Sequence, residues 1–300
     1  MSQSAPDKRP AFGNRHLSEN SDIYQHNAWD NVDWDEEFKN SVIEKIDVNS
    51  KQKLSVEKAL ELDQKSSFYW EQFYDKHDNK FFKDRHWLFT EFPELLPENV
   101  STNEKKVILE LGCGVGNTVF PILQIDNSNS LFIFCCDFSD KAIQIIKENK
   151  FYNEKFCHAF VFDITSQWNL MPFEPESLDI VTMIFVLSAI DPLCHKNIIQ
   201  NITRYLKPNG LILFRDYGYC DLTQTRFKAG KCIKDNFYVR GDGTRSYFFK
   251  ETEIDQLFSE CGLIKDSLNV DRRLQVNRAN KKKMYRIWIQ AKYKKCTDLS

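Results

Sequence analysis

Apolar runs of strand length alternate with stretches that favour helices through the second half of the chain. The apolar runs cover residues 107–111, 131–137, 159–163, 178–188 and 211–218. The stretches that favour helices lie near 117–125, 139–150 and 193–206. Continuous apolar strands joined by helices are typical of a parallel sheet with helices on both faces. We therefore expect an α/β domain over residues 98–300.

The end of the chain predicts one more helix and two more strands. The helical stretch TEIDQLFSEC is followed by Gly262, a residue type that commonly ends helices. Strands are expected near 265–275 and 284–293. The second of them, in MYRIWIQAKY, alternates apolar and polar residues. This alternation favours an antiparallel strand that ends the sheet.

The first 97 residues have a different pattern, and we expect them to form an N-terminal extension. Residues 1–35 are polar with scattered rings and predict irregular structure, whereas residues 36–65 are charged and favour helices. Ten aromatic residues lie among the twenty-five from Phe68 to Phe92. These rings either fill a core between a helix and the sheet or face a ligand. For Phe68 and Phe73 we expect the core.

Composition and charge exclude some classes of protein. The chain has 300 residues, a net charge of -2 and a pI near 6.3, which argues against a protein that coats nucleic acid over its whole surface. A local basic patch is still possible, because ten Lys or Arg and one acid lie between Asp271 and Lys295. The alternative is that this basic stretch is simply a solvated face.

Cysteine usage and the termini indicate an intracellular protein. The nine cysteines form no CxxC pair and no metal-like cluster with histidine, and we expect Cys135 and Cys136 to be buried, reduced thiols. No metal site is therefore predicted. The N-terminus has neither an apolar signal core nor the composition of a transit peptide. No apolar run approaches the ~18 residues of a membrane span. We expect the cytoplasm, with the nucleus as a second location, and no membrane partner.

A glycine loop follows the first strand of the α/β domain. Its spacing is GxGxG from Gly112, with Glu110 two residues before it. Asp137 ends the next strand, where a carboxylate accepts hydrogen bonds from both ribose hydroxyls. Asp163 ends the third strand, where an acid accepts from an exocyclic amine such as that of adenine. The loop lacks the lysine of a P-loop. These residues predict a nucleoside site without a pyrophosphate, which fits S-adenosylmethionine; NAD binding and an ordinary tight turn are the alternatives.

The end of the fourth strand limits the methyl acceptor. The sequence there is Ile184-Phe185-Val186-Leu187-Ser188, without the D/N-P-P-Y/F/W box of exocyclic-amine methylases. Cys194 and Cys220 are not in the Pro-Cys or Thr-Cys setting that a cytosine-C5 methylase needs. An acceptor that needs little activation is left, such as the N3 atom of cytosine, for which alignment supplies most of the catalysis.

The fifth strand ends in a ring, a cation and an acid that suit the N3 atom of cytosine as the methyl acceptor. Methylation of N3 makes the base positive, and a nearby carboxylate would stabilise that charge. Arg215, Asp216 and Tyr217 are therefore the candidate catalytic residues. The alternative is a buried Arg–Asp pair that caps the strand. N3 lies on the Watson–Crick edge, so the base must be unpaired or flipped out.

The stretch FFKDRHW combines aromatic rings with cations, as a binding site for single-stranded RNA does. The bases of such RNA stack on rings, and its phosphates pair with cations. Phe82, Lys83 and Arg85 are the candidates. Trp70 and Tyr74 are four residues apart, on one face of a helix, and would cover the cofactor. Farther along, residues 241–244 predict a turn that presents Arg240 and Arg245; the alternative is a plain hairpin.

Several motifs together resemble the tRNA N3-methylcytidine methyltransferases. They are YWEQFYDKHDNKFFKDRHW, LELGCGVGN, CDFS, IFVLSAI, FRDYG and YVRGDGTRSYFF, and the resemblance covers roughly residues 66–292. Members of this family modify cytidine 32 in the anticodon loop. FGNRHL and HNAWDNVDWDEE are similar to the branch that acts on threonine tRNAs, and in animals also on arginine tRNAs.

The resemblance implies a class I, Rossmann-like fold with a seven-stranded sheet, S-adenosylmethionine as cofactor and the tRNA anticodon stem-loop as partner. An aminoacyl-tRNA synthetase or another accessory protein is a further expected partner; DNA is not. The implied cofactor contacts are Trp70, Tyr74, Gly112, Gly114, Asp137, Asp163, Ile164 and Ile184. The implied RNA side is Phe82, Lys83, Arg85, Arg215, Asp216, Tyr217, Arg240 and Arg245. A non-catalytic RNA-binding scaffold and a methyltransferase for a protein or small molecule stay open as alternatives.

Overall fold

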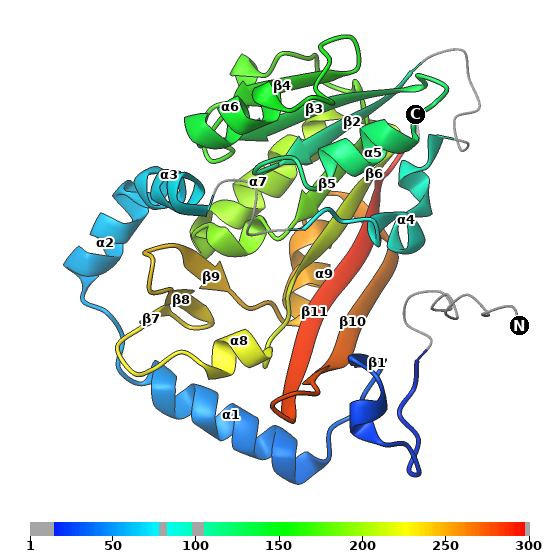
Figure 1. The fold of residues 1–300 in the computed structure, drawn as a ribbon. Coiled ribbons are helices and arrows are strands. Elements are labelled where there is room, and N and C mark those ends of the chain that lie inside the picture. The colour runs from blue at the N-terminus through cyan, green and yellow to red at the C-terminus, as the bar shows by residue number, and fades with distance from the viewer. Residues whose placement is uncertain (1–14, 78–82, 98–104, 298–300) are drawn as a thin grey trace, which may run out of the picture.

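The strands expected from the apolar runs assemble into one mixed sheet (Figure 1). The computed structural model describes residues 15–77, 83–97 and 105–297. In sheet order, the strands of this described part are β1 (Ala28–Asp30), β10 (Leu263–Asn277), β11 (Lys282–Lys295), β6 (Leu206–Tyr217), β5 (Leu178–Ile184), β2 (Lys106–Leu111), β3 (Leu131–Asp137) and β4 (Cys157–Val161).

The strands β6, β5, β2, β3 and β4 are parallel, as their continuous apolar sequences predict. β11 pairs antiparallel with β6, and β10 pairs antiparallel with β11, which confirms the prediction for the end of the chain. β5 ends at Ile184 and not at Ser188, because residues Leu187–Ala189 turn into a short 3-10 helix. The C-terminal ends of the parallel strands therefore meet at one edge of the sheet.

The sheet has eight strands in the described residues, where seven were expected. The additional strand is β1, which pairs antiparallel with the outer edge of β10. Trp29 of β1 is 3% exposed and packs with Leu274 and Val276 of β10. The expectation that residues 1–35 are irregular was therefore wrong for this segment. Three residues are too few to show an alternating pattern, and the strand exists because β10 offers a free edge.

Helices cover both faces of the sheet and bury two apolar layers. α7 (Pro192–Tyr205) and α9 (Glu251–Ser259) pack on one face, whereas α4 (Leu88–Glu91), α5 (Val119–Ile125) and α6 (Asp140–Glu148) pack on the other. Cys135 and Cys136 are fully buried in β3, as expected. Among the described residues, no helix is long and apolar enough to cross a membrane.

Three helices of the N-terminal extension run around one side of the molecule (Figure 1). α1 (Glu36–Ser50) contacts α8 (Leu222–Thr225), and α3 (Ser66–His77) contacts α6. Between them, α2 (Val56–Gln64) packs through Leu62 on a small second sheet. That sheet consists of β7 (Cys232–Lys234), β8 (Phe237–Val239) and β9 (Arg245–Tyr247). This path brings α3 and the second sheet to the edge where the parallel strands end.

Candidate active site

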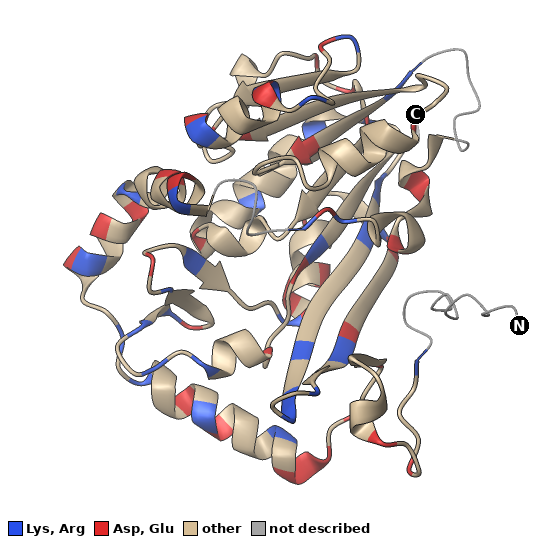
Figure 2. Cartoon of the chain, in the orientation of Figure 1, with Lys and Arg blue, Asp and Glu red and all other residues tan. Residues whose placement is uncertain are grey.

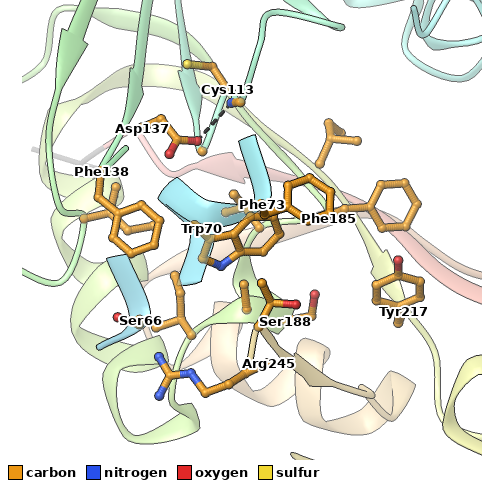
Figure 3. A pocket seen from close by; sticks show the side chains of 18 of the residues that line it. Ser66, Trp70, Phe73, Cys113, Asp137, Phe138, Phe185, Ser188, Tyr217 and Arg245 are labelled. Atoms are coloured by element: carbon orange, nitrogen blue, oxygen red, sulfur yellow. Dashed lines mark hydrogen bonds between the residues drawn. The ribbon is translucent and has the colours of Figure 1, made fainter. Parts of the chain in front are cut away.

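One cavity of about 610 Å³ lies at the C-terminal ends of β2, β3 and β5. Its wall is completed by α3 and by the β8–β9 turn (Figure 3). All the residues expected to contact the cofactor line it, namely Trp70, Tyr74, Gly112, Gly114, Asp137, Asp163, Ile164 and Ile184. Lys83, Arg85, Tyr217, Arg240 and Arg245 from the expected RNA side line it as well.

The glycine loop requires glycine for two physical reasons. Gly112 and Gly114 have φ values of +58° and +53°, in the left-handed region that glycine adopts without strain. A Cβ on Gly112 would lie 1.7 Å from Cγ2 of Val186, and a Cβ on Gly114 would lie 2.9 Å from the hydroxyl of Tyr74. The loop is therefore closely packed between the end of β5 and α3, and it is more than an ordinary tight turn.

Asp137 is fixed at the end of β3 with its carboxylate at the cavity. It accepts hydrogen bonds from the N–H groups of Gly114 at 2.9 Å and Ser139 at 3.1 Å (Figure 3). Burial raises the pKa of Asp137 to about 6, and these backbone donors oppose the rise. An ionised carboxylate offers about four acceptor positions, so positions are left for the two hydroxyls of a ribose.

Asp163 lies two residues beyond β4, on the neighbouring side of the cavity. Its Oδ1 accepts from the N–H and the hydroxyl of Thr165, at 2.9 and 2.8 Å. The ring of Phe138 and the side chain of Ile164 line the cavity between the two acids. Two acids and an apolar surface fit the ribose and base of a nucleoside. The residues present therefore fit S-adenosylmethionine.

The aromatic face of α3 closes this half of the cavity. The rings of Trp70 and Tyr74 lie 5.9 Å apart, and Trp70 also contacts Phe73 at 5.3 Å. Phe73 is 7% exposed, which confirms that it belongs to the core. The same expectation was wrong for Phe68, which is 52% exposed. Phe68 lies near the start of α3, one turn before the residues that pack against Val115 and Ala142.

The described part of the stretch FFKDRHW begins at Lys83 and is only partly exposed, and Phe81 and Phe82 lie outside the described residues. Lys83 is exposed at the cavity, whereas the Arg85 side chain is only 16% exposed. Arg85 donates to the Thr118 hydroxyl at 2.9 Å, and its Nη1 lies 3.8 Å from Oε1 of Glu110. Burial raises the pKa of Glu110 to about 7. Arg85 thus ties the aromatic segment to the glycine loop.

Arg215 and Asp216 at the end of β6 lie behind the cavity wall, whereas Tyr217 faces it. Arg215 is 3% exposed, pairs with Asp271, and has its guanidinium 4.9 Å from each of the rings of Trp87 and Trp288. The alternative of a buried Arg–Asp pair is therefore borne out for Arg215, but its partner is Asp271 and not Asp216, because successive strand residues point to opposite faces.

Asp216 is fully buried beneath the segment that follows β5. It accepts hydrogen bonds from the N–H of Ser188 at 2.9 Å and from that of Tyr217 at 2.8 Å. Burial raises the pKa of Asp216 to about 6. Ser188 itself lines the cavity. Asp216 therefore supplies negative charge one residue layer behind the acceptor side of the wall.

The β8–β9 turn presents two arginines to the cavity. The guanidinium of Arg240 lies 5.6 Å from the ring of Tyr217 and donates to the hydroxyl of Ser246 at 3.0 Å. Arg245 is 7% exposed and pairs with Asp63 of α2. The turn joins two strands of the second sheet, so its backbone is a hairpin, as the alternative states. Its two arginines also line the cavity, which a plain hairpin does not explain.

Comparison with known proteins identifies the family. Residues 109–212 match the model of a methyltransferase domain. The chain is 48% identical to the tRNA N(3)-cytidine methyltransferase METTL2 of Xenopus tropicalis, over 96% of this chain and 95% of that protein. It is 49% identical to the Drosophila melanogaster tRNA N(3)-methylcytidine methyltransferase, over 96% and 90%. The chain belongs to the tRNA N(3)-cytidine methyltransferase family.

The family extends to fungi and shares its fold with other methyltransferases. The relative in Schizosaccharomyces pombe is 43% identical over 95% of this chain and 92% of its own length. A Pyrococcus horikoshii protein of known structure superposes with a TM-score of 0.53 at 16% identity, over 75% of this chain and 98% of that one. A Burkholderia thailandensis N1-methyltransferase superposes with a TM-score of 0.51 at 11% identity, over 78% and 91%. These likenesses support the class I fold.

The cavity of this family member also contains residues that sequence reasoning missed. They are Phe185, Ser188, Arg286 and Trp288, among others. Arg286 donates through Nε to Asp221 at 2.8 Å, and its guanidinium lies 4.8 Å from the Trp288 ring. Arg286 and Trp288 both belong to β11, and no local sequence pattern shows that this strand lies beside β6.

The basic stretch 271–295 is paired within the fold only in part, and basic residues are frequent along β10 and β11 (Figure 2). Arg273 pairs with Asp30, Glu91 and Asp271, and Arg286 pairs with Asp221. Lys292 and Lys295 pair with Glu94 and Glu176. Part of its charge is therefore neutralised within the fold. Arg278 and Lys281–Lys283 are exposed, so the alternative of a solvated face holds for the turn between β10 and β11.

Proposed function

We propose that this protein transfers a methyl group from S-adenosylmethionine to N3 of cytidine 32 in the anticodon loop of tRNA, with threonine tRNAs as the first candidates. Relatives that share 42–49% of its residues over nearly the whole chain bear the name of this activity. One structural observation carries the proposal. A single cavity joins the glycine loop and its two acids to a wall of rings and arginines.

The cofactor half of the cavity binds and orients the methyl donor. When bound, S-adenosylmethionine supplies an activated methyl group on a positively charged sulfur. Asp137 and Asp163 are placed to hold the ribose and the base, and α3 covers them with Trp70. The glycine loop lets the backbone approach closely, because no side chain intervenes. The protein thereby holds the reactive end of the cofactor towards the other half.

The acceptor half holds the cytidine. N3 has a free lone pair near neutral pH, so positioning it next to the methyl group supplies most of the acceleration. The cytosine becomes positive as the bond forms, and the ionised Asp216 behind Ser188 favours that charge. Lys83, Arg240 and Arg245 line the cavity where phosphates of an unpaired loop would pass.

The experiment uses purified protein, labelled S-adenosylmethionine and tRNA from cells that lack the gene, followed by mass spectrometry of the nucleosides. New N3-methylcytidine, mapped to position 32 of threonine tRNA, is the expected result. Label in another nucleoside would contradict the acceptor. Cofactor binding without transfer to any tRNA would favour the scaffold alternative, and transfer to proteins would favour a protein methyltransferase.

Partners and location belong to the same proposal. We expect an accessory protein, such as an aminoacyl-tRNA synthetase, to raise the rate with unmodified tRNA, which adding it to the purified reaction would measure. The protein is proposed to act in the cytoplasm, where threonine tRNA is used. Fractionation of cells that express the tagged chain checks this location against the nucleus.

A further inference from the structure

Phe185 directly follows β5, and its backbone adopts a conformation that aromatic residues rarely take. Its φ is +61°, in the left-handed region that glycine and asparagine populate more readily. Its N–H donates to the carbonyl oxygen of Arg215 at 2.8 Å, so the ladder with β6 holds the turn in place. An aromatic residue in this conformation costs folding free energy, and such strain gathers at functional sites.

The strained backbone directs the Phe185 ring to the cavity. The ring is half-buried and lines the cavity, and its centroid lies 5.2 Å from that of Tyr217. The guanidinium of Arg85 lies 5.8 Å from the same ring. Figure 3 shows Phe185 and Tyr217 on the side of the cavity away from Asp137 and Phe138. Phe185 therefore belongs to the acceptor half.

The turn that carries Phe185 also touches the cofactor half. Ile184 before it lines the cavity, and Val186 after it packs so closely on Gly112 that a Cβ there would lie 1.7 Å from Cγ2 of Val186. The position of the Phe185 ring is thus fixed relative to the glycine loop. A surface held in this way sets the distance between whatever lies on it and the cofactor.

We propose that Phe185 is a positioning residue whose ring, braced by Tyr217, forms the platform on which the flat acceptor base stacks beside the methyl donor. This inference rests on the proposed function. In the transfer, the N3 lone pair forms the new N–C bond, the electron pair of the breaking C–S bond stays on sulfur, and the base gains the positive charge. A stacked base keeps its ring plane, and therefore N3, aligned with the methyl group.

The test compares Phe185→Leu with Phe185→Tyr, and with Phe151→Leu as a control on an exposed phenylalanine in the loop after α6. Single-turnover transfer is measured at saturating cofactor and tRNA, and cofactor affinity is measured by calorimetry. Phe185→Leu is expected to slow transfer roughly tenfold or more, because base–ring stacking is lost. Its cofactor affinity stays within about twofold, since cofactor contacts remain. Phe185→Tyr restores most of the rate that the leucine variant loses, and the control keeps the wild-type rate.

Two results would overturn the proposal. The first is transfer at the wild-type rate by Phe185→Leu. The second is a loss of cofactor affinity in this variant as large as its loss of rate, since the ring would then serve the cofactor. The backbone claim has its own measurement: Phe185→Gly should unfold at a higher temperature than Phe185→Ala, because glycine relieves the left-handed strain. The reverse order would refute the strain, even if the leucine variant folded poorly.

Failure of this inference is distinguishable from failure of the proposed function. If the wild-type protein forms no N3-methylcytidine on any tRNA, the proposed function fails before any variant is compared. If the wild-type protein methylates and Phe185→Leu does so equally well, the function stands and the platform is refuted.

Discussion

At the scale of single residues, burial decides how the acids of the site behave. Asp137 ends β3 and Asp216 lies next to the end of β6, with β5 and β2 between these two strands, and burial raises the pKa of each acid to about 6. Asp137 faces the cavity, whereas Asp216 reaches it through Ser188. In the proposed function, the same chemical group binds the cofactor in one case and stabilises charge in the other. Asp137 can therefore be tested by cofactor affinity, and Asp216 by turnover.

Asp137→Ala is expected to weaken S-adenosylmethionine binding by roughly tenfold or more, because charged hydrogen bonds to the ribose are lost. Asp140→Ala, in the exposed first turn of α6, is the matched control. Calorimetry measures both. Unchanged affinity in the Asp137 variant would remove the ribose assignment.

The pH dependence of cofactor binding follows from the same carboxylate. Only the ionised form accepts from both hydroxyls, and the pKa of Asp137 is about 6, so affinity should rise as the pH increases through 6 and then level off. In Asp137→Asn this rise should be flatter, since the amide does not titrate. An identical pH profile in both proteins would show that another group is responsible.

Asp216→Asn is expected to lower turnover more than cofactor affinity, because its charge acts on the positive base. The wild-type rate should fall as the pH drops through about 6, where Asp216 takes up a proton, and the variant should lose that step. The comparison of rate with calorimetric affinity is the measurement. Normal turnover in the variant would exclude the charge-stabilising role.

At the scale of elements, the N-terminal extension is both part of the sheet and part of the cavity. β1 adds an eighth strand, and α3 supplies rings to the cofactor half. Trp29 anchors β1, since it is 3% exposed and its Nε1 donates to the carbonyl oxygen of Ile23 at 2.7 Å. β1 lies at the β10 edge of the sheet, whereas α3 lies at the cavity, so the two contributions can be tested separately.

Trp29→Ala should lower the free energy of unfolding by roughly 3 kcal/mol, as expected for a buried aromatic ring. Cofactor affinity should stay unchanged, because β1 is at the β10 edge of the sheet and not at the cavity. Denaturant unfolding and calorimetry measure the two effects. Leu170→Ala, at a 73% exposed position, is the control. Equal stability of the Trp29 variant would mean that β1 does not anchor the extension.

At the scale of the whole molecule, the cations divide into those held by the fold and those open to a ligand. Arg85, Arg215 and Arg273 are buried in ion pairs, whereas Lys83 is exposed at the cavity. An overall charge of -2 is therefore compatible with an exposed cation at the cavity. Substitution of a cation held in an ion pair should therefore have a different effect from substitution of the exposed Lys83.

Lys83→Gln is expected to weaken tRNA binding and to reduce its salt dependence by about one phosphate contact, without changing cofactor affinity. Arg85→Gln should weaken cofactor binding too, because Arg85 supports the glycine loop through Thr118. Lys196→Gln, at an exposed position of α7, is the control. Filter binding at several salt concentrations measures the slopes. An equal loss of cofactor affinity in the Lys83 variant would refute its role as an RNA contact.

The sequence by itself determined the features that depend on local pattern. Continuous apolar runs predict buried parallel strands, so β2, β3 and β6 and the helices between the strands lie close to their expected positions. The GxGxG spacing and the acids Asp137 and Asp163 follow strand ends, and strand ends of a parallel sheet meet at one edge. That the glycine loop and the two acids line one cavity was therefore predictable from the sequence.

Only the tertiary structure decided what depends on distant neighbours. Arg85 and Arg215 look like RNA contacts in sequence, but they pair with Glu110 and Asp271, which come from other strands. β1 forms because β10 provides an edge, and Trp288 reaches the cavity because β11 lies beside β6. A charge or a short strand has no fixed environment until the chain folds, since its partners lie far away in the sequence.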